Sequence, residues 1–407
     1  MGDSFDASGA AGSLEEPNRS ILLTNQHLKE YAGSELVTLD LAVLFKSRGW
    51  SVTIATFATG KPLAGWFAKY CIPIYDVLDG QLPCKQYDLI WAHHSAVLVK
   101  CLVDDGVATR RLVVSSLSPF TPLEAPPLFA NRADLILANS QETFSEIKRY
   151  WKDINLKTFP NSVSMPWFNF PKRQRNDSQL RKIAVISHHP PDELLALKKL
   201  LGRHKISVTY YGLKGRYSLL TPDTLYQYDA IISIGRTVQH AMARGLPVYC
   251  YDHFGGPGWL TRDNYEKAEW FNYSGRCTPR KLPSDKIADE IVSGFQGASA
   301  CLGFFDKLAF ERYNLEKNVD DILHAVEFDT LSAQEYKTYG NFSDCILASR
   351  LNQPYIETLQ ELRQNRAFMS LYYWRRRRER LIPQGTKRKH LYDMLLRACR
   401  AALNGGR

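Results

Sequence analysis

From Ile21 onward, short apolar runs alternate with longer segments whose apolar residues recur at helical spacing. Residues 35–49 show this spacing, with Ser34 placed to cap the start of a helix and Gly49 placed to end it in a left-handed conformation. Strands and helices that alternate in this way predict an α/β fold with a parallel sheet covered by helices. The apolar runs of this first series are ILLT, VTIATF, YDLIWA, RLVVSSL and ADLILANS.

A second series of the same kind follows a polar segment that begins with proline and carries mixed charges. This segment, residues 171–182, is expected to be a linker. The runs after it are IAVISHH, SVTYYG, AIISIG and PVYCYD. The pattern therefore predicts two Rossmann-like, doubly wound parallel-sheet domains, residues 21–170 and 183–328, that face each other across a cleft. A disordered leader (1–20) and a basic helical C-terminal extension (329–407) complete the expected organisation.

The net charge of +10 is concentrated at one end of the chain. Residues 360–407 hold 13 Lys and Arg against 3 Asp and Glu, whereas the other 359 residues hold 39 of each kind. A nucleic-acid partner is therefore not expected for the two domains. The eight cysteines include no C-x-x-C pair and imply neither zinc nor disulfides. With no signal-peptide pattern and no apolar run of 18 residues, the protein is expected to be cytoplasmic.

Arg236 and Thr237 follow the strand AIISIG, at the start of a predicted helix that ends near Gly245. Ligands bind beyond the carboxyl ends of strands in open parallel sheets, and the unpaired N–H groups at a helix start attract anions. A guanidinium beside them predicts a site for the oxygens of a diphosphate. The alternative is that Arg236 is a solvated loop charge and Thr237 only a cap.

A glycine-rich segment, HFGGPGWLTRDN, follows the strand PVYCYD. Glycine lets a backbone approach a ligand closely or adopt a positive φ angle. We therefore expect Asp252, His253, Gly255 and Gly256 to line a sugar or phosphate pocket. The alternative is a plain turn-rich loop.

Each predicted domain also has a strand that ends in a histidine doublet, His93–His94 in the first and His188–His189 in the second. Adjacent side chains of an extended segment point in opposite directions, so one histidine of each pair is expected to face the cleft. Hydrogen bonding to a hydroxyl or phosphate is the favoured role, and a half-buried structural imidazole is the alternative. A metal site built from both doublets and Asp252 is a minor alternative that the spacing does not demand.

These segments together resemble a GT-B glycosyltransferase of the retaining family-4-like group, of the kind used in surface-polysaccharide assembly. The resemblance covers about residues 21–328. It implies that the loop with Gly33, Ser34 and Glu35 lies near the acceptor and the donor phosphates. It also implies that His93 contacts the donor sugar and that residues 236–245 form the donor-binding helix. The segments that carry the resemblance are YAGSELVTLDLAVLFKSRGWSVTIAT, YDLIWAHHS, LILANS, FPNSV and ARGLPVYCYDHFGGPG.

The sequence departs from this family at two glutamates that lie eight residues apart. Their positions fall at Ile232 and His240, and neither residue is acidic. The contact that these glutamates make with the donor ribose in the family is therefore not expected here. Arg236 is expected to supply the charge that the donor pyrophosphate needs.

The expected function is transfer of a hexose from a nucleotide-sugar to a polysaccharide or lipid-linked acceptor, without a cofactor or an essential metal. Such an enzyme must stabilise a departing diphosphate, which is an electrostatic task. His93 and Arg236 are the expected catalytic residues, and the expected donor-binding residues are Thr237, His188, Asp252, His253, Gly255 and Gly256. Two alternatives remain open: a nucleotide-sugar epimerase, and a non-catalytic protein that binds a sugar nucleotide or acts as a scaffold.

The basic extension carries its own pattern. Leu391, Leu395, Cys399 and Ala402 share one face of a predicted helix that follows the arginine cluster of YYWRRRRER. A basic amphipathic helix suits an anionic membrane surface, which would place the enzyme peripherally at the inner face of the membrane. The alternatives are a helix that packs on the first domain with its arginines in water, and RNA binding.

Overall fold

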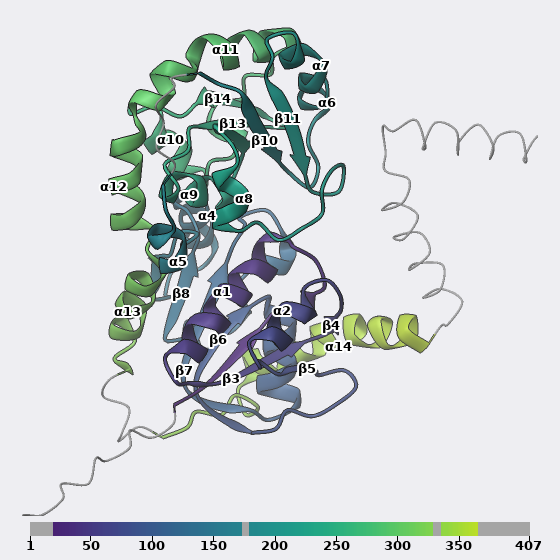
Figure 1. Ribbon diagram of the computed structural model, residues 1–407. Coiled ribbons are helices and arrows are strands. Elements are labelled where there is room, and N and C mark those ends of the chain that lie inside the picture. Colours follow the sequence, from purple (N-terminus) through teal and green to yellow (C-terminus); the bar gives the residue numbers. More distant parts are fainter. Residues whose placement is uncertain (1–18, 173–178, 329–334, 365–407) are drawn as a thin grey trace, which may run out of the picture.

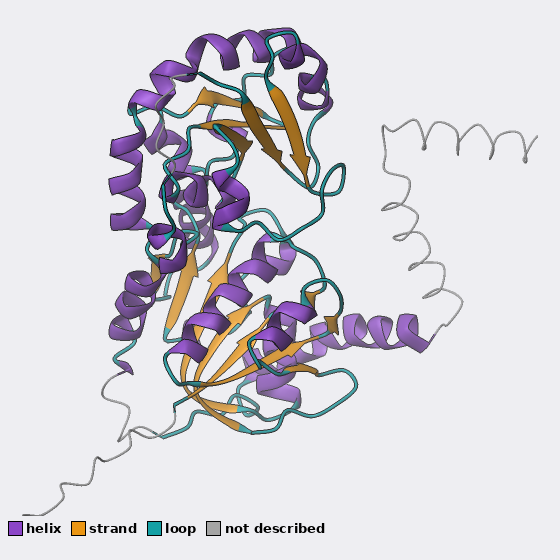
Figure 2. Ribbon diagram, in the orientation of Figure 1, coloured by secondary structure: helices purple, strands orange, loops and turns teal. Residues whose placement is uncertain are grey.

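The structure is a computed structural model, and it describes residues 19–172, 179–328 and 335–364 (Figure 1). The described chain forms two α/β domains, each built on a mainly parallel sheet with helices on both faces, as the sequence predicts. Figure 2 shows the strands of both sheets running toward the region where the domains meet. None of the helices in these residues is long and apolar enough to span a membrane.

In the described residues the first sheet has seven strands, and all the neighbouring pairs are parallel. Ile21 and Leu23 point into one apolar core and Leu22 into the other, so both faces of the central strand are buried. Along the sheet the strands are β5 (Ile74–Asp76), β3 (Ser51–Thr56), β1 (Ser20–Thr24), β6 (Gln86–His93), β7 (Ala108–Ser116), β8 (Leu135–Ala138) and β9 (Leu156–Thr158). A separate short pair joins β2 (His27–Leu28) to β4 (Ala58–Thr59).

The first long helix of this domain begins and ends close to the predicted residues. Gly49 follows it with a φ of 81°, which confirms the predicted left-handed end. The predicted cap is wrong, because Ala32 is the N-cap and Ser34 lies inside the first turn. Helices in this part of the chain are α1 (Gly33–Ser47), α2 (Ala64–Lys69), α3 (Ser95–Val99), α4 (Gln141–Tyr150) and α5 (Met165–Asn169).

The second sheet has five strands in the described residues, four of them parallel. The fifth strand, β14, runs antiparallel to β13 and contains the glycine-rich segment that the sequence places in a loop. The strands are β11 (Ser207–Tyr211), β10 (Lys182–Ile186), β12 (Ala230–Ser233), β13 (Val248–Asp252) and β14 (Gly255–Trp259). The helices are α6 (Asp192–Leu195), α7 (Leu197–Gly202), α8 (Pro222–Tyr226), α9 (Arg236–Ala243), α10 (Tyr265–Trp270), α11 (Ser284–Ala300) and α12 (Leu302–Arg312).

After α12 the chain returns to the first domain. Helix α13 (Leu315–Ala325) contributes Leu315, Val319 and Ile322 to the core beside α1, although the sequence pattern places residues up to 328 in the second domain. Helix α14 (Ser343–Gln364) packs on the opposite face of the first sheet through Cys345, Ala348 and Ile356. Residues 1–18 of the expected leader and the basic segment 365–407 lie outside the described residues, whereas Ser20, the last residue of the expected leader, begins β1.

Candidate functional site

The residues that follow the strand ends meet at the interface between the two domains. His188 follows β10, and its Nε2 lies 2.7 Å from the carbonyl oxygen of Tyr31 in the loop before α1. The Tyr31 N–H donates to the Tyr217 hydroxyl at 3.3 Å, and the two tyrosine rings lie 5.4 Å apart. A carbonyl oxygen only accepts, so His188 carries its proton on Nε2. His188 therefore lies at the interface, where it joins the two domains.

Arg236 and Thr237 lie in the first turn of α9, where the sequence predicts an anion site. Gly235 precedes them with a φ of 58°, which turns the chain sharply from β12 into the helix. The Arg236 guanidinium forms an ion pair with Asp40 of α1, in the other domain. Burial raises the pKa of Asp40 and the Arg236 charge opposes this effect. Arg236 is thus a bridge between the domains and not a solvated loop charge.

The Glu35 carboxylate accepts hydrogen bonds from backbone N–H groups of the loop before α1. Glu35 Oε1 accepts from the N–H groups of Lys29 at 3.0 Å and Glu30 at 3.1 Å, and Oε2 accepts from Ala32 at 3.2 Å. Burial raises the pKa of Glu35 to about 7, although these hydrogen bonds favour the charged form. Glu35 therefore occupies three backbone N–H groups of the loop that the family resemblance places near the acceptor and the donor phosphates.

The other two residues of this loop lie within the first turn of α1. Gly33 and Ser34 are the first two residues of the helix. A Cβ added at Gly33 would meet nothing within 4 Å, so no close approach inside the protein requires glycine there.

The first histidine doublet is buried, against the expectation that one of its members faces the cleft. His93 is 0% exposed, and burial lowers its pKa to about 4, so its ring is neutral at pH 7. Its Nδ1 lies 3.4 Å from the Thr38 hydroxyl, and its Nε2 has no partner in the described residues. The expectation assumed an extended chain, but His94 has a φ of 66°.

His94 has a structural role. The Gln26 N–H donates to His94 Nδ1 at 3.0 Å, which leaves the proton on Nε2, 3.2 Å from Glu124 Oε1. Burial opposes ionisation of Glu124, but its hydrogen bonds with His94 and with the Leu117 N–H outweigh this effect and lower the pKa of this carboxyl. The pair fixes the loops after β1 and β7 to the end of β6.

Basic side chains gather on the second domain's side of the interface. Burial lowers the pKa of His189, and the charges of His188, His253 and Lys214 lower it further, so these groups lie near one another. Both His189 and His253 are exposed. The sequence pattern predicts no role for Lys214. The local signal that could have drawn notice to it is the pair of glycines, Gly212 and Gly215, on either side of its loop. Gly212 has a φ of 119°, and a Cβ there would come within 2.1 Å of the Ser187 oxygen.

Asp252, Gly255 and Gly256, which are expected to line a sugar or phosphate pocket, make close contacts within the protein that hold the hairpin of β13 and β14 together. The Asp252 carboxylate accepts from Phe254 N at 2.8 Å, and from Ser274 Oγ and Gly275 N, both at 2.9 Å. A Cβ on Gly255 would lie 2.4 Å from the Arg280 backbone, and one on Gly256 would lie 2.1 Å from the Cys250 oxygen. The close approach that requires glycine is to the protein's own backbone.

The described residues contain no group of three His, Cys, Asp or Glu side chains that could hold a metal ion. The minor metal hypothesis needed His93, His94, His188, His189 and Asp252 together. Asp252 instead binds three donors of its own hairpin region, and His94 binds Gln26 and Glu124.

The comparisons with known proteins concern the fold. No family model matches this sequence, and no curated protein matches it. The crystal structure of Anabaena HepE in complex with UDP covers 76% of this chain and 99% of its own, with 14% identity and a TM-score of 0.50. The fold is GT-B. A glycosyltransferase from Rickettsia africae (12% identity, 77% and 100% covered, TM-score 0.49) and the galactosyltransferase WaaB (13%, 75% and 99%, 0.47) are also similar in structure.

Apolar or neutral groups occupy the two positions that are glutamates in the family that the sequence resembles. Ile232 lies within β12 and is 1% exposed. His240 lies on α9, with its Nδ1 2.9 Å from the Arg236 carbonyl oxygen and its ring edge-on to Trp167. Burial lowers the pKa of His240 well below its ordinary value, so the ring is neutral at pH 7.

A groove of about 510 Å³ opens between the domains on the α10 side of α9. We call it the α4–α10–α13 groove, after the helices that border it, and α4 and α10 lie close to each other where the two domains meet (Figure 1). Asn272, which lines the groove, accepts from the Asn161 amide of the first domain at 2.9 Å, and a second interdomain contact joins Arg276 to Glu142 at 2.9 and 2.6 Å. Residues that line it include Gln141, Thr158, Gln239, Glu266, Trp270 and Asp321.

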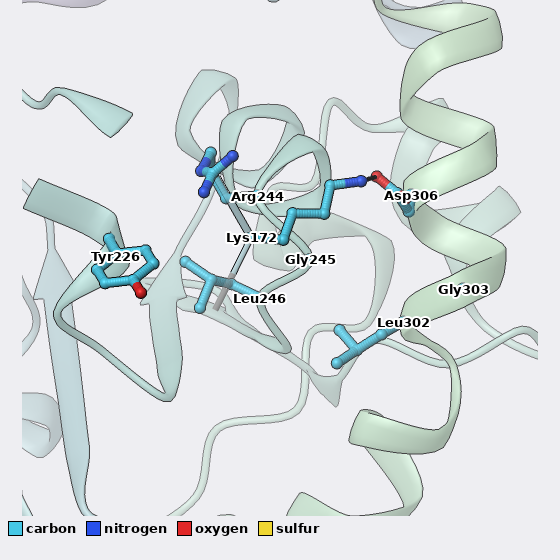
Figure 3. Close-up of a pocket in the computed structure, with 8 residues that line it drawn as sticks. All are labelled: Lys172, Tyr226, Arg244, Gly245, Leu246, Leu302, Gly303 and Asp306. Atoms are coloured by element: carbon cyan, nitrogen blue, oxygen red, sulfur yellow. Dashed lines mark hydrogen bonds and ion pairs between the residues drawn. The ribbon is translucent and has the colours of Figure 1, made fainter. Parts of the chain in front are cut away.

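A second cavity, of about 250 Å³, lies at the other end of α9 (Figure 3). Lys172 reaches across it to form an ion pair with Asp306. Arg244 donates to the carbonyl oxygens of Trp167 at 3.0 Å and Phe170 at 2.5 Å. Lys172 and Arg244 therefore both bind groups of the protein itself. Their contacts hold the chain just before the linker against the second domain.

Proposed function

We propose that the protein transfers a hexose from a nucleotide-diphosphate sugar to a saccharide or lipid-linked acceptor, with retention of configuration, in the assembly of a surface polysaccharide. The observation that carries the proposal is the start of α9, where Arg236 and Thr237 lie at the interface of two GT-B domains. The basic group of His188, His189, His253 and Lys214 supports it. The similar HepE was crystallised with UDP, which supports a uridine nucleotide as donor.

The proposed chemistry is electrostatic. A departing diphosphate needs positive charge and N–H donors that are already in position, and the start of α9 supplies both. The diphosphate must compete with Asp40 for the Arg236 guanidinium, so donor binding would open the Arg236–Asp40 ion pair. The carboxylates of Glu35 and Glu124 already accept hydrogen bonds from the chain, which favours a mechanism without a general base.

A non-catalytic protein that binds a sugar nucleotide is the second candidate. It is favoured by His93, the expected sugar contact, which is 0% exposed. It is also favoured by the neutral His240 at a position that is acidic in the resembling family.

Thermal-shift measurements with UDP-, GDP- and dTDP-sugars test the donor, since a ligand that binds the folded state raises its stability by mass action. We expect one nucleotide series to stabilise the protein. Radiolabelled hexose transferred to an added acceptor, without epimer formation, would then exclude both the epimerase and the non-catalytic protein. Stabilisation without turnover on any acceptor would support the second candidate. No stabilisation by any of the nucleotides would overturn the proposal.

A further inference from the structure

The α4–α10–α13 groove is separate from the basic group at the interface and differs from it in charge. Four carboxylates line it, from Glu266, Glu269, Glu311 and Asp321, against two cations, from Arg312 and Lys317. Arg312 is already bound to Glu269 at 2.6 Å. A phosphate would meet a net negative surface here, so the nucleotide is excluded from the groove on electrostatic grounds. The groove suits a ligand without negative charge.

Trp270 gives the groove a flat apolar surface. It is the last residue of α10, its side chain lines the groove, and it is 46% exposed. Its indole N–H has no hydrogen-bond partner in the described residues. An exposed indole combines a large apolar face with a polar edge and binds groups that share both characters. A sugar ring has this character, with C–H groups on its faces and hydroxyl groups around its rim.

The polar lining matches the hydroxyl groups of such a ligand. Carboxylate and amide oxygens accept hydrogen bonds from hydroxyls, and amide N–H groups donate to them. Asp321 has no partner among the described residues, and the exposed Gln141 lines the groove from the first domain. The groove volume of about 510 Å³ lies in the range of small-ligand sites.

The inner end of the groove lies next to the expected donor site. Gln239 lines the groove and lies three residues after Arg236 on α9, about one helical turn away. We propose that the α4–α10–α13 groove binds an uncharged saccharide, with one sugar ring stacked on Trp270. The idea that this saccharide is the acceptor of the transfer reaction rests on the proposed function, whereas the idea that the groove binds a saccharide does not.

The test is direct binding of neutral trisaccharides (maltotriose, cellotriose and chitotriose), measured by saturation-transfer NMR and calorimetry on the full-length protein. We expect at least one to bind. Trp270→Ala should weaken its binding at least about tenfold, and Trp270→Phe should weaken it less, because a smaller aromatic surface remains. Tyr150→Ala is the matched control, since Tyr150 is an aromatic residue at the other end of α4 that is 67% exposed and does not line the groove. It should leave binding unchanged.

The outcomes separate this proposal from the proposed function. If a nucleotide stabilises the protein but no trisaccharide binds, or if Trp270→Ala binds as tightly as the wild type, the groove proposal is overturned and the donor proposal stands. Trisaccharide binding that depends on Trp270 but occurs without any nucleotide effect supports the groove and overturns the transferase. Tighter binding of a sulfated trisaccharide than of its neutral counterpart would contradict the charge argument. Circular dichroism of each variant establishes that it is folded.

Discussion

At the scale of single residues, two carboxylates of α1 occupy the groups that an anionic ligand would need. Glu35 accepts the N–H groups of the loop before the helix, and Asp40 pairs with Arg236. The sequence predicts Arg236 at the start of a helix because the strand and the turn are local features. Its partner could not be predicted, since Asp40 lies 196 positions away and only the packing of the two domains joins them.

Substitutions at Arg236 and Asp40 should shift nucleotide affinity in opposite directions. Arg236→Ala removes a charge-assisted contact to the diphosphate and should weaken UDP binding by about 1.5–3 kcal/mol, or more than tenfold. Asp40→Asn removes the competing carboxylate and should tighten UDP binding, because Arg236 is no longer neutralised. Calorimetric titration with UDP measures both, and uridine is the control that neither change should affect. UDP affinity that is unchanged in Arg236→Ala would remove Arg236 from the donor site.

Glu35 should make the stability of the protein depend on pH. Its pKa is raised from 4.5 to about 7 in the folded protein, so between these values the folded state binds more protons than the unfolded chain. The favourable contribution is complete below pH 4.5 and is lost as the pH rises through 7. The loss amounts to at most about 3 kcal/mol.

The comparison is between wild type and Glu35→Gln, by urea denaturation from pH 4.5 to 8. Glutamine cannot ionise, so the stability of the variant relative to wild type should increase with pH across this interval. Loss of hydrogen bonds that the Glu35 carboxylate accepts changes the free energy of unfolding of the variant by the same amount at every pH, so it does not change the slope of stability against pH. Equal slopes for the two proteins would show that Glu35 ionises normally.

At the scale of elements, the apolar pattern predicted the two sheets, because strands buried on both faces form short continuous apolar runs. The glycine-rich segment forms the strand β14, where the sequence placed a loop, and this has a physical reason. Glycine marks a close backbone approach whether the neighbour is a ligand or another strand, and β14 contains no apolar alternation that would identify it as a strand. The burial of both His93 and His94 at the end of β6 could not be predicted either, because the positive φ of His94 has no local sequence signal.

Gly255→Ala should destabilise the hairpin of β13 and β14. The residue has a φ of 101°, and its new Cβ would lie 2.4 Å from the Arg280 backbone, which cannot move without disturbing the hairpin. We expect a loss of about 3 kcal/mol or more in the free energy of unfolding. Gly297→Ala is the control, because this exposed position on α11 has an ordinary φ and nothing within 4 Å. It should stabilise the protein by about 0.5–1 kcal/mol, measured by the same denaturation experiment.

At the scale of the whole molecule, the last two described helices, α13 and α14, pack on the first domain. Arg363 near the end of α14 binds Asp76 at 2.6 Å and Asp79 at 2.7 Å. The sequence could not assign α13 and α14 to the first domain, because helical spacing shows that a helix has a buried face but not which core receives it. The choice depends on contacts between residues that lie far apart in the chain.

The exposed surface of α14 includes a row of apolar side chains beside polar ones such as Arg350, Gln353 and Glu357. Leu347 and Leu351, four residues apart, are 51% and 65% exposed, and Tyr355 continues the row at 37%. The strongly basic segment 365–407 follows this helix directly in the sequence. Exposed apolar side chains next to a run of arginines have the composition of a surface that meets anionic lipids.

Removal of residues 370–407 should therefore separate membrane binding from donor binding. Each basic residue near an anionic surface contributes about 1 kcal/mol, so the full-length protein should sediment with phosphatidylglycerol vesicles at low salt and less at high salt. The truncated protein should remain in the supernatant while its nucleotide-induced thermal shift is unchanged, because the deletion leaves α14 and both sheets intact. Leu351→Glu in the full-length chain should weaken sedimentation partly, whereas Tyr150→Glu, on α4, should add the same charge without this effect. Salt-sensitive sedimentation that survives the truncation would refute the role of the extension and place the membrane contact elsewhere on the protein.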